Sequence, residues 1–186
     1  MVDFCPSFTA RASEYIGKEE FSRRVGHCYT ESLHTFTPPA GKYDLVWIQW
    51  VAGHLTDDDF VQFLRRCGNG LTEGGCVVLK ENLTKGEQSD FDEVDNSWTR
   101  PRRLLLELYS KAGMVLLGER RQLNFPKAFY EVKMMALKPI RMVPNWDQGC
   151  EHGEDGVNTS LCADNRLVAS QVAESGVLWF AKRPMK

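Results

Sequence analysis

The sequence lacks the features that mark nucleic-acid-binding, membrane and secreted proteins. Its 23 Lys and Arg residues stand against 25 Asp and Glu residues, so it has no basic excess of the kind that nucleic-acid binders carry. No apolar run approaches the about 20 residues of a membrane span; the longest, residues 45–55, contains Gly53 and His54. Asp3 stands where a secretion signal has basic residues, which predicts an intracellular protein.

The six cysteines follow neither a disulfide pattern nor a zinc-binding pattern. No two of them form a C-x-x-C motif, and their spacings are irregular. The nearest approach to a metal cluster is Cys150, His152 and Cys162, of which only one spacing is short enough for zinc. We therefore predict no bound metal, and free thiols in a reducing compartment.

Apolar runs alternate with helical patterns up to residue 138, which predicts one α/β domain with a largely parallel sheet. Thr56 precedes three aspartates, a pattern typical of a helix N-cap. Gly74-Gly75 is expected to form a turn before a strand. Residues 139–186 show little periodicity and are expected to form a mostly disordered tail, within which residues 177–180 have the character of a strand or docking segment. The expected strands are 25–29, 45–50, 76–79, 114–118 and 130–137, and the expected helices are 7–16, 57–67 and 101–112.

Polar and aromatic residues follow the most apolar of these strands. Residues 45–50 are apolar on both faces, as in a central strand, and the run ends at Gln49 and Trp50, shortly before His54. Ligands of open α/β sheets bind at such carboxyl ends. Core packing of Trp50 and a capping role for His54 remain alternatives.

Charged residues are gathered in three short stretches. Residues 81–95 hold six acids against one base, which fits either a solvated loop or a site for a cationic ligand. The basic clusters at Arg65-Arg66 and at residues 100–103 are expected to be solvated helix faces.

Four segments resemble the alpha-N-terminal protein methyltransferases. They are L-V-W-I-Q-W-V-A-G-H-L-T at residues 45–56, F-L-R-R-C at 63–67, L-K-E-N at 79–82 and D-E-V-D-N-S at 92–97. The resemblance covers residues 1–137, about three quarters of the chain. It implies a Rossmann-like class I methyltransferase sheet. It also implies that S-adenosylmethionine (SAM) is used to methylate the α-amino group of proteins that begin Xaa-Pro-Lys, in the nucleus and the cytoplasm.

The resemblance implies a role for each matching residue. Asp3 would bind the SAM ribose, Leu33 and His34 the adenine, and Gln49 the methionine part. The residues that would bind the substrate are Trp50, Asn82, Asp92, Asp95 and Ser97. His54 and Asp95 match the pair that deprotonates the substrate amine. Such a base is needed because an α-amine with a pKa near about 8 is largely protonated at neutral pH.

The family also has a first strand and a glycine-rich loop, which would precede Met1 and which we expect this domain to lack. That strand is central in such sheets, so its absence predicts weak SAM binding and marginal folding. The alternative function is therefore a catalytically inactive remnant or a module that binds N-terminal peptides. A small-molecule methyltransferase is a weaker alternative, because the residues at 50, 92 and 95 match peptide binders.

Overall fold

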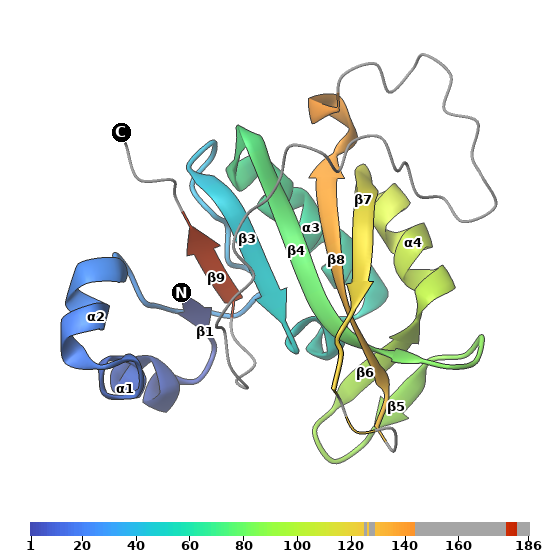
Figure 1. Ribbon diagram of the computed structural model, residues 1–186, viewed down its shortest axis with the longest axis horizontal. Coiled ribbons are helices and arrows are strands. Elements are labelled where there is room, and N and C mark those ends of the chain that lie inside the picture. The colour runs from blue at the N-terminus through green and yellow to red at the C-terminus, as the bar shows by residue number, and fades with distance from the viewer. Residues whose placement is uncertain (125, 127–128, 144–177, 182–186) are drawn as a thin grey trace.

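The structure is a computed structural model that describes residues 1–124, 126 and 129–143, together with the main chain of 178–181. An α/β domain is built around one long sheet (Figure 1). The first half of the chain forms β1 (Val2–Asp3), α1 (Pro6–Ile16), α2 (Lys18–Arg24), β2 (Tyr29–Thr30), β3 (Tyr43–Gln49), the 3-10 helix η1 (Ala52–His54), α3 (Asp57–Gly70) and β4 (Leu71–Thr84). The second half forms β5 (Asp90–Asp92), β6 (Ser97–Pro101), α4 (Arg102–Lys111), β7 (Met114–Arg121), β8 (Glu131–Pro139), the 3-10 helix η2 (Ile140–Met142) and β9 (Leu178–Ala181).

The sheet is mixed, not largely parallel as predicted. Its strand order is β2-β1-β9-β3-β4, and β8 and then β7 continue beyond β4. The pairs β1–β2 and β3–β4 are parallel, whereas β7, β8 and β9 are antiparallel to their neighbours. At its carboxyl end β4 also pairs with β6, which forms a hairpin with β5. The α/β architecture is as expected, but β8 and β9 run in the opposite direction to β3 and β4.

Helix α3 provides much of the core, and it forms where the sequence predicts it. The Thr56 side chain accepts a hydrogen bond from the Asp59 N–H at 3.2 Å, which caps the helix. Phe60, Phe63 and Leu64 recur at helical spacing and are fully buried. Helices α3 and α4 lie side by side on one face of the sheet, while α1 and α2 lie beyond its β1 end (Figure 1).

Strand β4 begins at Leu71, five residues before the predicted start, because Gly74-Gly75 is a bulge and not a turn. The pairing with β3 jumps from Tyr43↔Leu71 to Leu45↔Cys76. A Cβ atom at Gly75 would lie 2.9 Å from the Tyr43 carbonyl oxygen, so only glycine fits the bulge without a shift.

Other boundaries also differ from the prediction. The strand expected at residues 25–29 is β2, which begins only at Tyr29. Helix α2 and the β5–β6 hairpin were not predicted, because both are short and largely exposed and so have no apolar periodicity.

Strand β9 lies in the middle of the sheet. It runs antiparallel to β3, with Leu178↔Ile48 and Ala181↔Leu45 as the outer pairs, and Leu178 also pairs with Val2 of β1. Within the described residues, β9 therefore links β1 and β2 to the rest of the sheet. The remainder of the predicted tail beyond residue 143, with its Cys150–Cys162 cluster, lies outside the described residues.

The described residues contain neither a membrane-spanning helix nor a cluster of metal-ligating side chains. None of the described helices is long and apolar enough to cross a membrane. Across the same residues, no group of three His, Cys, Asp or Glu side chains is placed to hold a metal ion.

Candidate active site

The candidate site lies where β3 and β4 end. Trp50 leaves β3 with a left-handed backbone, φ 51°, and its N–H donates to the Lys80 carbonyl of β4 at 3.2 Å. The Lys80 ammonium lies 4.7 Å from the centroid of the Trp50 ring, a cation–π contact. Trp50 is partly buried, so the indole is neither a core residue nor a fully exposed one.

Two buried donors at this edge have no partner within the described residues. Gln49 is fully buried, and its Oε1 accepts from the Trp47 indole at 3.1 Å, yet its Nε2 is unpaired. The Trp50 Nε1 is likewise buried and unpaired. Buried polar groups nearly always have partners, so these two donors fit a ligand that brings acceptor oxygens, such as the carboxylate of the methionine part of SAM.

Asp3 ends β1, on the other side of β9 from Gln49. Its Oδ1 accepts from the Cys5 N–H at 2.7 Å, a turn that orients the carboxylate, and the residue is only partly buried. An accessible carboxylate at a strand end fits a ribose hydroxyl pair.

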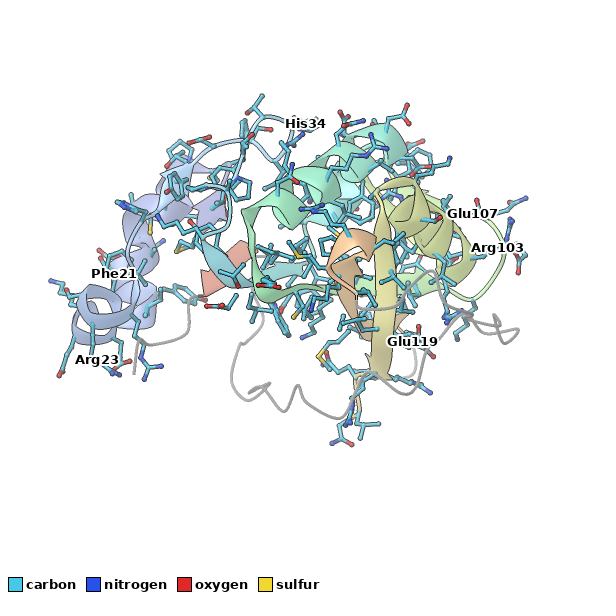
Figure 2. The ribbon with its side chains drawn as sticks, turned by 90° about the horizontal axis from the view of Figure 1, so that it is seen from above. Phe21, Arg23, His34, Arg103, Glu107 and Glu119 are labelled. Atoms are coloured by element: carbon cyan, nitrogen blue, oxygen red, sulfur yellow. The ribbon has the colours of Figure 1, made fainter. Side chains whose placement is uncertain are left out.

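Leu33 and His34 lie in a loop that Arg66 attaches to α3. The Arg66 guanidinium donates to the carbonyls of Leu33 at 2.6 Å, His34 at 3.0 Å and Phe36 at 2.9 Å. The prediction that Arg66 is only solvated is therefore wrong. His34 is exposed near α3 (Figure 2), with Nδ1 3.0 Å from the Ser32 hydroxyl. Its role toward adenine stays a prediction.

Of the segments that carry the predicted substrate residues, η1 packs against the β5–β6 hairpin. A Cβ atom at Gly53 would lie 3.0 Å from the Trp98 carbonyl oxygen, which shows how closely the two segments approach. Asp92 and Ser97 are register partners across the hairpin, and Asn82 lies on β4, next to Glu81.

His54 and Asp95 are both exposed, on η1 and on the turn between β5 and β6. In the described part of the chain no hydrogen bond or ion pair joins these two side chains. The deprotonating pair therefore stays a prediction, which requires a bound amine to lie between them.

A cavity of about 900 Å³ opens beside this hairpin. None of the predicted substrate residues lines it. Tyr130 is one of its walls and donates to Asp90 at 3.0 Å, and this hydrogen bond raises the pKa of the Tyr130 phenol. The lining residues are Thr84, Lys85, Gly86, Glu87, Gln88, Asp90, Phe129 and Tyr130.

Sequence reasoning missed Glu81 and Arg100. Glu81, counted with the acidic loop, is a partly buried residue of β4. Burial raises the pKa of its carboxyl to about 7, against the lowering effect of hydrogen bonds from the main chain and of the Arg100 charge. Arg100, expected to be solvated, is 4% exposed. No local pattern distinguishes it from Arg103, which is exposed.

Comparison with known proteins identifies relatives of this chain. Residues 1–138 match the family described as AdoMet dependent proline di-methyltransferase. The chain belongs to this family. Alpha N-terminal protein methyltransferase 1 of Caenorhabditis elegans is 45% identical over 139 residues, which is 75% of this chain and 58% of the relative. N-terminal Xaa-Pro-Lys N-methyltransferase 1 of Mus musculus is 41% identical over 138 residues, which is 74% of this chain and 60% of the relative.

Solved structures confirm the class I methyltransferase fold. A SAM-dependent methyltransferase of Leishmania major superposes with a TM-score of 0.66 at 30% identity, covering 74% of this chain and 53% of that one. A 1,6-didemethyltoxoflavin-N1-methyltransferase of Burkholderia thailandensis, at 15% identity and a TM-score of 0.59, covers 74% and 59% and shares the fold. The chain thus spans about 60% of the length of the curated relatives described above. The family resemblance seen in the sequence is confirmed, and the family is SAM-dependent.

Proposed function

We propose that this chain methylates the α-amino group of protein N-termini of the Xaa-Pro-Lys type, with SAM as methyl donor. The observation that carries the proposal is the convergence of η1, the end of β4 and the β5–β6 hairpin, which brings the segments of Trp50, His54, Asn82 and Ser97 to one edge of the sheet. The name of the mouse relative supports the same substrate class, and the name of the worm relative supports methylation of protein N-termini.

SAM supplies an electrophilic methyl group when it is bound; the chain supplies position and a base. Asp3 and the unpaired Gln49 Nε2 would hold the cofactor at the ends of β1 and β3. Trp50 gives a flat surface for the first substrate residues. His54 or Asp95 removes a proton from the substrate ammonium, which leaves a nucleophilic amine. Aligning that amine with the methyl carbon is a positioning effect.

The charge of the hairpin suits a cationic peptide. Asp90, Asp92, Glu93 and Asp95 are all exposed on or next to β5. An N-terminal ammonium and a lysine two residues later each gain from such a negative field, which also speeds encounter at low salt. The substrate partner is accordingly a protein with a free, basic N-terminus.

A labelled-methyl transfer assay tests the proposal. The full chain is incubated with radiolabelled SAM and a peptide that begins Ser-Pro-Lys, with the N-acetylated peptide as control. We expect label only in the free peptide, and a fall of about 10²–10⁴ in rate when the base is removed by His54→Ala or Asp95→Ala. Label in the acetylated peptide, or unchanged rates in both variants, contradicts the proposal.

The direction of β9 favours a second candidate, a module that binds N-terminal peptides without catalysis. β9 stands between the strands that end in Asp3 and Gln49, but it is antiparallel, so it brings its first residue, Leu178, to this edge. A glycine-rich cofactor loop instead follows the last residue of a parallel strand. Calorimetric titration separates the candidates, because the module binds the Ser-Pro-Lys peptide but gives no heat with SAM.

Localisation in the nucleus and the cytoplasm remains a proposal from the family resemblance. Fluorescence microscopy of the tagged full chain tests it, and exclusive signal in another compartment would contradict it.

A further inference from the structure

The segment from Trp50 to Asp57 carries the indole and the imidazole of the candidate site. Two main-chain hydrogen bonds lie within it, from the His54 N–H to the Val51 carbonyl at 3.3 Å and from the Leu55 N–H to the Ala52 carbonyl at 3.2 Å. The β3–β4 ladder ends with the hydrogen bond from the Trp50 N–H to Lys80. Trp50 then adopts its left-handed conformation, which a residue with a side chain keeps only where its surroundings hold it. The 3-10 helix that follows is three residues long and has no side-chain cap of its own.

Glu81 on β4 holds the first half of the segment. Its Oε1 accepts hydrogen bonds from the N–H groups of Val51 and Ala52, both at 3.1 Å. These amides stand at the start of η1, where a helix has no internal acceptor for them. The Glu81 Oε1 therefore caps the N-terminus of η1, although Glu81 lies about 30 residues away in the sequence.

Arg100 on β6 holds the second half. Its guanidinium donates to the Ala52 carbonyl at 3.1 Å, to the Leu55 carbonyl at 2.5 Å and to the Asp57 carboxylate at 2.8 Å. Ala52 is thus held at its N–H by Glu81 and at its carbonyl by Arg100. Three divergent acceptors match the fixed fork of a guanidinium and not the single ammonium of a lysine.

We infer that Glu81 and Arg100 are positioning residues that fix the Trp50–Asp57 segment in the shape in which it presents Trp50 and His54 to the substrate. Neither side chain needs to touch the substrate, since both act through main-chain groups of the segment. The inference deepens the proposed function and rests on it for the identity of the ligand, but the immobilisation itself is measurable without any ligand.

Hydrogen exchange of the segment, read by mass spectrometry, is the first test. Glu81→Leu keeps the approximate size of the side chain but removes the acceptor, and we expect residues 50–57 to exchange about tenfold faster. Glu81→Gln keeps an acceptor oxygen and should remain within about threefold of the wild-type rate. Arg100→Lys should also accelerate exchange about tenfold, in the later part of the segment.

Glu119→Leu is the matched control. Glu119 is a partly buried carboxylate on β7 (Figure 2) that accepts from Arg102 at 2.9 Å and Lys133 at 2.5 Å and is not hydrogen-bonded to the segment. This variant should alter exchange near β7 and β8 and leave residues 50–57 at the wild-type rate.

Affinity for the Ser-Pro-Lys peptide is the second readout. It should fall about tenfold in Glu81→Leu and be restored in Glu81→Gln. If residues 50–57 of Glu81→Leu exchange at the wild-type rate, the inference is overturned. If Glu81→Leu does not fold, as judged by circular dichroism, the decision passes to Arg100→Lys, and an unchanged exchange rate in that variant overturns the inference. Absence of peptide binding by the wild type refutes the proposed function, while the exchange contrast still decides the inference.

Discussion

The titration of Glu81 gives a quantitative prediction about stability. Burial raises the pKa of this carboxyl from 4.5 to about 7 in the folded protein. Because the folded-state pKa is the higher one, folding favours the protonated form. The protonated carboxyl therefore increases the free energy of unfolding. This increase is fully present below pH 4.5 and is lost as the pH rises to and through about 7. At about 1.36 kcal/mol per pH unit between the two values, the loss totals about 3 kcal/mol.

Comparison with Glu81→Gln isolates this effect, since the glutamine keeps an acceptor for Val51 and Ala52 but does not titrate. Urea unfolding of both proteins, followed by circular dichroism from about pH 3.5 to about 8.5, gives the two free energies of unfolding. We expect the difference to shift in favour of the variant by about 3 kcal/mol between acidic and alkaline pH. A difference that stays flat would refute a carboxyl that is buried and hydrogen-bonded as described.

Glu119→Gln serves as the control of opposite sign. Burial favours a raised pKa at Glu119, but the hydrogen bonds from Lys133 and Arg102 outweigh it and lower the pKa. The stability that this carboxylate contributes is present above its unfolded pKa and is lost as the pH falls through its folded pKa. The advantage of the wild type over this variant should therefore shrink at acidic pH only.

Three further predictions concern the strands and the helix around the candidate site. Deleting residues 178–186 removes β9, which joins β1 to β3; limited trypsin digestion should then cleave residues 1–30 faster, and an unchanged digestion pattern would contradict this. Thr56→Ala removes the cap of α3 and should cost about 1 kcal/mol, which lowers Tm by about 2–4 °C in a thermal melt, whereas Thr56→Ser should not. Gly75→Ala places a Cβ 2.9 Å from a main-chain oxygen and should lower the urea-unfolding free energy by about 1–3 kcal/mol, while Gly86→Ala, which meets no atom within 4 Å, should leave it nearly unchanged.

Elements with a strong local signal were predicted closely. The helix expected at residues 57–67 is found at Asp57–Gly70, and the strand expected at 45–50 is found at Tyr43–Gln49. A cap, a hydrophobic period and an apolar run are all properties of neighbouring residues, so the sequence displays them directly. The β5–β6 hairpin was missed because its strands are short and mostly exposed and gain order by pairing with the end of β4.

What the sequence by itself determined is the family, through the motif at residues 45–56, and the elements that bury their own periodic apolar faces. What only the tertiary structure decided is the burial of Arg100 and Glu81 and the place of β9 in the sheet. Arg100 is buried by acceptors 43 to 48 residues away, and β9 pairs with strands that precede it by more than a hundred residues. Burial and pairing over such distances depend on the whole packed chain, so no local pattern of the sequence displays them.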